Sequence, residues 1–367
     1  MDITKSVGNL IDFYNENELE TLKYKIEQYV SLNHFQKLSV FSILCNEDFP
    51  SILKNSIPDN FNIEIKKAND YWKLLINRTI IKNEQERVVS GIAFIEKPDY
   101  GKNIWNIFTI DDSDFQENCI NRLIDLLIPK ISRFFLNSSE MKSIFTDLDD
   151  KGYSILVNKA VSYSHKEEGS ISYKKEQYYK VFQEAEDKGY YVDKMEVIIR
   201  KNHKFILHGF ISREGSSKFA NGDIMFFYKN FLPSIASFGE AKREKLIKKE
   251  KMADYVLSPI ALKFSKDIIL ETGDNKRIIR SLSNMPHSSV LVYHSNPYLH
   301  LSFLDYMDGS NCDIFVSSSN EISIYPGSKA SMPALMRIFD QLSKDFEEGT
   351  IIEKEQNKEL KFSDFIS

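Results

Sequence analysis

The side chains best suited to acid–base chemistry gather in one stretch of the chain. Between His287 and Tyr306 the sequence reads His-Ser-Ser-Val-Leu-Val-Tyr-His-Ser-Asn-Pro-Tyr-Leu-His-Leu-Ser-Phe-Leu-Asp-Tyr, which holds three of the seven histidines. Imidazole titrates near neutral pH, so a pair of histidines can serve as general acid and general base, or bind a phosphate. His294, His300 and Ser302 are therefore the candidate catalytic residues.

A β-hairpin would bring these side chains together. If Ser295-Asn296-Pro297 forms the turn, His294 pairs with Tyr298 and Val292 pairs with His300. The two histidines are then diagonal neighbours on one face, roughly 7–8 Å apart. The apolar face of this predicted hairpin consists of Leu291, Tyr293, Leu299, Leu301 and Phe303. The alternative is structural, because histidines on a half-covered sheet often satisfy a neighbouring carbonyl or carboxylate.

One short segment resembles a catalytic unit of a known family. His300-Leu301-Ser302-Phe303 is similar to the histidine–hydrophobic–hydroxyl–hydrophobic unit of the two-histidine phosphoesterases. That family needs a second such unit, and the nearest candidate, His208-Gly209-Phe210-Ile211, lacks the hydroxyl residue. The resemblance would imply phosphodiester cleavage by two imidazoles, but we assign no family from one unit.

Basic residues form a second candidate site. The segment Glu240–Lys251 has an excess of positive charge, and Lys242, Lys245, Lys248 and Lys249 could contact nucleic-acid phosphates. Arg277 and Arg280, on a predicted helix, could reach the histidine face. The alternative is a solvated helix with pairing between residues four apart, because no aromatic residues for base stacking accompany the lysines.

Motifs of the common enzyme classes are absent from the sequence. It contains no phosphate-binding glycine loop, no nucleophile elbow and no zinc-binding histidine pair. Cys45, Cys119 and Cys312 lie far apart, which predicts ordinary thiols and no cysteine-based metal site. Acidic clusters at 111–114 and 147–150 could hold Mg²⁺, although aspartates at such positions usually cap helices or form turns. We expect no metal site and leave the cofactor unknown.

Composition limits the class of protein. The chain has 367 residues, 42% of them hydrophobic, and a net charge of −5. Two folded domains are therefore expected, and nucleic-acid binding would need a local basic patch. The N-terminus has no signal-peptide pattern and no stretch predicts a membrane span, so we expect a cytoplasmic protein.

Hydrophobic spacing predicts the elements that position the candidate residues. The expected fold class is α+β, with antiparallel β-meanders each followed by a helix and with a helical N-terminal segment. A helix over 34–44 belongs to that segment. The predicted strands cover 61–66, 71–77, 88–96, 104–110, 194–200, 204–212, 223–228, 288–294, 298–306, 312–317 and 321–325. The predicted helices start near Asp114, Lys174, Pro233 and Ser331, and the last buries Leu335, Ile338, Phe339, Leu342 and Phe346.

A polar segment suggests where the domains meet. Residues 161–175 are rich in serine, glycine and charge and lack apolar periodicity, which predicts a linker. The expected domains are then 1–160 and 176–349, followed by a polar tail at 350–367. The order of meander and helix occurs three times, which is compatible either with a diverged repeat or with ordinary α+β architecture.

Two functions from different classes follow. The first is a non-catalytic binding or assembly subunit that engages a protein or nucleic-acid partner. Such a subunit could also form an oligomer. A composition rich in Lys, Ile and Asn suggests a bacterial accessory system, such as antiviral defence. The alternative is a phosphodiester-cleaving enzyme, either histidine-based or Mg²⁺-dependent, that acts on nucleic acid or nucleotides. Whether the chain is an enzyme stays open at this level.

Overall fold

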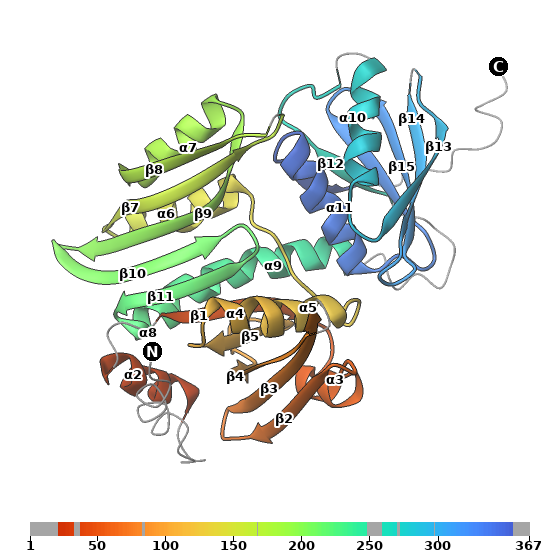
Figure 1. Cartoon of the computed structure of the whole chain (residues 1–367). Helices are drawn as coiled ribbons and strands as arrows, with labels where there is room; N and C mark the ends of the chain where they lie inside the picture. The colour runs from red at the N-terminus through yellow and green to blue at the C-terminus, as the bar shows by residue number, and fades with distance from the viewer. Residues whose placement is uncertain are drawn as a thin grey trace. The chain divides into compact units, whose positions relative to one another are not determined.

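The computed structural model describes residues 21–32, 37–82, 85–166, 168–247, 259–269, 272–296 and 298–354 (Figure 1). It confirms an α+β protein, in which antiparallel strands alternate with helices. The strands form two sheets. The larger sheet has the order β2-β3-β4-β5-β1-β11-β10-β9-β7-β8, with β6 paired to β1, and the smaller has the order β13-β14-β15-β16-β12-β17.

The larger sheet is built from these elements. Its strands are β1 (Leu38–Cys45), β2 (Phe61–Lys67), β3 (Tyr71–Lys82), β4 (Gln85–Glu96), β5 (Ile104–Thr109), β6 (Ile131–Ser132), β7 (Tyr153–Ser164), β8 (Ser170–Gln177), β9 (Tyr190–Lys201), β10 (Lys204–Ser212) and β11 (Ser216–Gly222). Its helices are α2 (Leu22–Leu32), α3 (Phe49–Asn55), α4 (Ser113–Phe115), α5 (Arg122–Leu126), α6 (Ser138–Asp150), α7 (Tyr178–Asp187), α8 (Ile224–Phe226) and α9 (Leu232–Ile247), with π-helical turns η1 (Gln116–Asn121) and η2 (Phe227–Phe231).

Strand β1 corrects the expected helix over 34–44. Its residues 38–45 are all buried and pair with β5 on one side and with β11 and β6 on the other. A central strand that is covered on both faces lacks the alternation of polar and apolar residues, so its run of apolar residues resembles a buried helix. Residues 33–36, where that helix was expected to start, lie outside the described residues.

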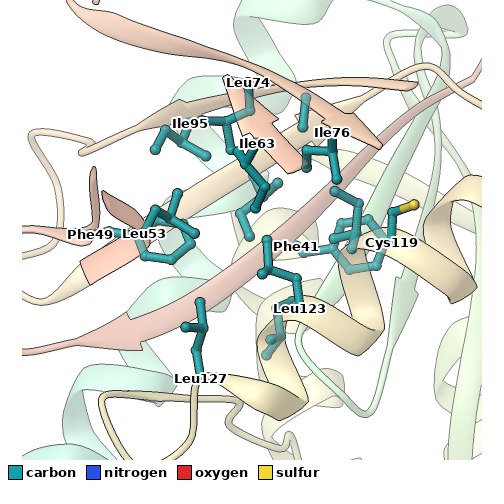
Figure 2. Packing of buried hydrophobic residues seen from close by; sticks show 14 of the residues in the cluster. Phe41, Phe49, Leu53, Ile63, Leu74, Ile76, Ile95, Cys119, Leu123 and Leu127 are labelled. Carbon is teal, nitrogen blue, oxygen red and sulfur yellow. The ribbon is translucent and has the colours of Figure 1, made fainter. Parts of the chain in front are cut away.

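The segment from α4 to α5 covers one face of the sheet beside β1 and β5 (Figure 1). Asp112 caps it, because its Oδ1 accepts the Phe115 N–H at 3.0 Å. Asp114, the expected cap, instead forms an ion pair with Arg87. Figure 2 shows the resulting core, where side chains from β1, α3 and the β2–β4 meander meet Cys119, Leu123 and Leu127.

The expected strand over 223–228 is helical. Asp223 Oδ1 accepts the Phe226 N–H at 2.9 Å and so starts α8, which continues through η2 into α9. Phe227 and Phe231 are fully buried and their rings stack 5.6 Å apart. The aromatic run favours a strand by propensity, and the aspartate cap together with burial along one helical side outweighs it.

The region expected to be a linker forms part of the larger sheet. It contains the end of β7 and most of β8, and Ser164 N donates to Gly169 O at 3.1 Å across the turn. Tyr173 is buried, while Lys174 and Lys175, which follow it on β8, are exposed. A charged strand at the edge of a sheet and a flexible linker share this composition, which explains the difference from expectation.

The smaller sheet comprises the remaining elements. Its strands are β12 (Ile260–Lys263), β13 (Ser288–His294), β14 (Leu299–Asp305), β15 (Asn311–Ser318), β16 (Glu321–Pro326) and β17 (Thr350–Glu353), and its helices are α10 (Thr272–Ser283) and α11 (Met332–Asp345). The prediction for α11 is confirmed: Ser331 Oγ accepts the Ala334 N–H at 3.2 Å as the cap, and Phe339 is fully buried. The other four residues of the predicted apolar stripe are buried as well.

The described residues divide into two compact units that interleave along the sequence. The first takes in segments Met1–Val161, Ser172–Val181 and Asp193–Glu240, and the second takes in Ser162–Ile171, Phe182–Val192 and Ala241–Ser367. This differs from the expected division into 1–160 and 176–349. The reason is that β1 pairs with β11, so strands from before and after the expected boundary belong to one sheet.

The N-terminal part of the larger sheet and the whole smaller sheet share one topology. Each begins with a strand and a helix, continues as a four-stranded meander, and then adds a helical segment and a short strand. In each, the first strand pairs with the last strand of the meander on one side and with the short final strand on the other. The first and third occurrences of the meander-then-helix order therefore share a topology, and the second, over β9–β11 and α9, is not part of this match.

Candidate functional site

The β13–β14 hairpin has a register that differs from the predicted one. Val292 lies opposite Leu301, and after a bulge His294 lies opposite His300. The sequence predicts that Val292 pairs with His300 and His294 with Tyr298, so the pairing is shifted along β14 by one residue at Val292 and, after the bulge, by two at His294. A shift of one residue exchanges the two faces of a strand.

The shift changes which side chains of β13 face the core. Leu291 and Tyr293, which were expected on the apolar face, are 60% and 58% exposed. Val290 and Val292 take their place, because they lie opposite Phe303 and Leu301, which are fully buried. The predicted positions of Leu299, Leu301 and Phe303 in the core are confirmed.

Four aromatic rings cross the outer face of this sheet, and we call them the aromatic ladder: Tyr293, His300, Phe315 and Tyr325. The centroid of the Tyr293 ring lies 4.8 Å from that of His300, and the His300 ring stacks on Phe315 at 4.1 Å. Phe315 meets Tyr325 edge-to-face at 5.1 Å. Each ring comes from a different strand, so the ladder spans the outer face from β13 to β16.

The two candidate histidines lie opposite each other on β13 and β14, but their rings contact different groups. His300 Nε2 lies 3.8 Å from Asp313 Oδ1, so the carboxylate and the Phe315 ring together orient this imidazole. The His294 ring instead lies 5.8 Å from that of Tyr298. Ser302 is half-buried on β14, opposite Leu291 and Asp313. The arrangement can bind a ligand at His300, whose imidazole is partly open to solvent.

The predicted basic patch is only partly within the described residues. Lys242 is buried, and Lys245 Nζ donates a hydrogen bond to Ile351 O at 3.0 Å. The side chains of both lysines therefore contact other parts of the fold. Lys248 and Lys249 lie outside the described residues.

The arginines of α10 do not join the histidines as the sequence suggested. Arg277 Nη2 donates to Asp345 O at 3.3 Å, and its guanidinium lies 4.8 Å from the Phe346 ring at the end of α11. Its Nη1 also lies 3.6 Å from Asp274 Oδ1. Arg280 is exposed on the same helix. The helix side of the sheet therefore holds Arg277, whereas the aromatic ladder lies on the other side.

Strand β13 ends its sheet without the features that usually protect such an edge. The other terminal strands are charged or short: β2 carries Glu64, Lys66 and Lys67, β8 carries Lys174, Lys175 and Glu176, and β17 has four residues. The sequence of β13, Ser-Ser-Val-Leu-Val-Tyr-His, contains no Asp, Glu, Lys, Arg or Pro. Proteins normally place charges or proline on edge strands because an unprotected edge pairs with other chains.

Large apolar side chains are exposed on and beside this strand. Six residues of the hairpin and its flank contribute: Leu291, Val292, Tyr293, Tyr298, Leu304 and Tyr306. We call β13 together with these residues the β13 surface. Sequence reasoning missed it, since the position of a strand at a sheet edge depends on the sheet order. The signal that could have found it is the absence of charge from a strand with four consecutive apolar residues, 290–293.

The described part of the chain shows no metal-binding cluster and no reactive thiol. Within it, no cluster of three or more His, Cys, Asp or Glu side chains could hold a metal ion. Cys45, Cys119 and Cys312 are buried, and burial raises the pKa of the Cys45 and Cys119 thiols to about 11 and that of Cys312 to about 12. They are ordinary core thiols with little thiolate at neutral pH.

Comparison with known proteins does not assign this chain to a family. No model of a protein family, no curated protein sequence and no solved structure matches this chain significantly. Among the described helices, none combines the length and the apolar character that a membrane crossing requires.

Proposed function

We propose that this chain is a binding and assembly subunit that receives an extended segment of a partner protein at the β13 surface. The observation that carries the proposal is the charge-free terminal strand β13 with its exposed Leu291 and Tyr293. An added strand would satisfy the free backbone groups of β13, and its alternate side chains would contact Leu291 and Tyr293 on one face.

Electrostatics favours a protein partner over a nucleic acid. Asp313 is half exposed beside His300 on the outer face, and its carboxylate would repel a phosphate backbone. Of the expected basic residues, Lys242 is buried and Lys245 donates to a backbone carbonyl. The aromatic ladder is therefore better suited to the apolar side chains of a peptide than to stacked bases.

The amino-acid composition supports a proposal about the biological system to which this subunit belongs. We infer a bacterial cytoplasmic protein within an accessory system such as antiviral defence, on the strength of the content of Lys, Ile and Asn alone.

A library of random peptides displayed on phage tests the proposal with the full chain. Peptides with alternating apolar residues should be selected, and a selected peptide should bind Leu291→Lys at least about tenfold more weakly, because the new charge would be buried under the added strand. Ile81→Lys is the matched control, since Ile81 is an exposed apolar residue on β3. Equal binding to wild type and Leu291→Lys, or selection of no such peptide, would rule the proposal out.

The competing function is phosphodiester cleavage, and one observation favours it. His294 and His300 lie opposite each other on adjacent strands, with Asp313 beside His300. An enzyme of this kind should cleave labelled RNA, DNA or a cyclic nucleotide, and His300→Ala should abolish the cleavage. The assay with and without EDTA also separates histidine-based from Mg²⁺-dependent chemistry.

A further inference from the structure

A polar pocket opens on the larger sheet, within the first unit. It has a volume of about 220 Å³ and lies between η1 and the strands β1 and β11, with the start of β9 and the end of β10 at its border. Figure 1 shows α4 and α5 over the neighbouring part of this face. None of its residues belongs to the β13 surface, so the pocket is independent of the proposed function.

Lys218 supplies the positive charge of the pocket. Its Nζ is half-buried and donates to Gln116 Oε1 at 3.3 Å, while Gln116 Nε2 donates to Asp111 O at 2.7 Å. This chain of hydrogen bonds fixes the position of the ammonium group. Burial, together with the nearby positive charge of Lys37, lowers the pKa of Lys218, so an anionic group placed there would stabilise its charged form.

A buried hydroxyl beside Lys218 has no partner. Ser39 lies opposite Lys218 on β1 and lines the pocket, and its side chain is 1% exposed. Within the described part of the chain, Ser39 Oγ makes no hydrogen bond. A buried polar group without a partner is costly, so native proteins seldom leave one unless a ligand or water satisfies it. A carboxylate oxygen in the pocket could accept this hydrogen bond.

Negative charges lie at the rim. Glu117 and Glu214 line the same pocket and are exposed, and a third carboxylate, Asp193, lines it from β9 and is partly buried, as Lys218 is. The pocket therefore combines one ammonium group and a buried hydroxyl with carboxylates that include the two exposed glutamates. Glu117 also favours the charged form of Lys218. A simple anion would be repelled by these carboxylates, whereas a molecule with both charges would be matched at each end.

We propose that this pocket binds a small zwitterion with one carboxylate and one ammonium group, the class of the free amino acids. The carboxylate accepts hydrogen bonds from Lys218 Nζ and Ser39 Oγ, and the ammonium group faces Glu117 and Glu214. The limited volume excludes a folded peptide or a nucleic acid, so the ligand is a small molecule.

Isothermal titration of the full chain with each of the common L-amino acids tests this site. At least one should bind with a stoichiometry of one, and Lys218→Met should weaken that binding about tenfold or more, since a charge-assisted hydrogen bond is lost. Lys151→Met, at an exposed lysine after α6, is the matched control. Ser39→Ala serves as the second variant if Lys218→Met does not fold.

Two further probes separate the zwitterion from simpler ligands. Propionate lacks the ammonium group and ethylamine lacks the carboxylate, so both should bind at least about tenfold more weakly than the best amino acid. Ser39→Ala should weaken amino-acid binding without lowering the melting temperature of the free protein, because its hydroxyl has no partner there. The proposal fails if no amino acid binds, if propionate binds equally well, or if Lys218→Met binds like the wild type. Where Lys218→Met does not fold, equal binding by Ser39→Ala and the wild type overturns it.

Discussion

His300 and His294 differ in what their rings contact, so their substitution should have different effects on stability. The His300 ring stacks on Phe315 and contacts Tyr293 at a tilt, whereas His294 is exposed near the hairpin turn. We expect His300→Ala to lower the free energy of unfolding by about 1 kcal/mol, the usual contribution of an aromatic pair, and His294→Ala to change it by less than about 0.5 kcal/mol. Urea titration of both variants measures this. A larger loss for His294→Ala than for His300→Ala would contradict the ring contacts described.

Glu96 makes stability depend on pH. Its carboxyl is buried, Oε2 has no partner, and burial raises its pKa from 4.5 to about 7, with Lys23 opposing and Asp70 and Asp99 adding to the shift. Because the folded state holds this proton more tightly, the carboxyl stabilises the fold below pH 4.5, and that stabilisation is lost as pH rises to 7.

Replacement of Glu96 should remove this dependence. The difference in free energy of unfolding between Glu96→Gln and wild type should shift in favour of Glu96→Gln by up to about 3 kcal/mol as the pH rises from 4.5 to 8. Denaturant titrations at both pH values measure the gain. Asp99→Gln, at a neighbouring acidic residue, provides a comparison. A constant difference between Glu96→Gln and wild type would show that the carboxyl does not titrate in this range.

The sequence identified the residue types of the hairpin but not their surroundings. The alternation of apolar and polar residues along this strand predicts that Leu299, Leu301 and Phe303 face the core, and all three are buried. It could not foresee the bulge between Val292 and His294, which sets the register of β13 and exposes Tyr293. The pocket around Lys218 escaped prediction for a related reason. Ser39 and Gln116 are distant in sequence, and only the pairing of β1 with β11 brings both next to Lys218.

At the level of single elements, α11 supplies the test of core packing. Its Phe339 is fully buried in the smaller sheet's core. Phe339→Ala should lower the free energy of unfolding by roughly 3–5 kcal/mol, since it removes buried surface and leaves a cavity. Phe205→Ala is the control, because Phe205 is exposed on β10 and should cost less than about 1 kcal/mol. Denaturant titration compares the two, and equal losses would contradict the burial of Phe339.

Elements with one covered face were predictable, whereas of the fully buried strands β1 and β5 only β5 was predicted. Strands β2–β4 and helix α11 show the spacing of half-buried strands and of an amphipathic helix, so their existence followed from sequence. Strand β1 is covered on both faces, and its apolar residues show no such period. The α8–η2 segment is rich in buried aromatic residues. Aromatic residues have high β-strand propensity, so the sequence predicts a strand there, and the helix cap at Asp223 is the weaker signal.

For the whole molecule, the pairing of β1 with β11 means that the chain should not separate at the expected linker. A protease recognition sequence inserted at Glu168, in the β7–β8 turn, should allow complete cleavage. The two fragments should still elute together in native size-exclusion chromatography, because the larger sheet contains strands from both. Separation of the fragments without denaturant would support the linker expected from sequence and contradict the continuous sheet.

The boundaries of the two compact units could not be predicted from the sequence. Domain boundaries from composition assume that each domain is one continuous stretch. Here Leu38 lies opposite Phe219, which joins strands from far apart in the sequence. No local pattern encodes such a pairing.

Hydrogen–deuterium exchange of the full chain, with and without a peptide selected on it, tests the central claim that β13 accepts an added strand. In the free protein the outward-facing amides of β13 should exchange fast, because no strand among the described residues pairs with that edge. The peptide should slow the exchange of residues 288–294 and leave that of β2, the charged edge of the larger sheet, unchanged. Binding of the peptide without protection of residues 288–294 would contradict the account.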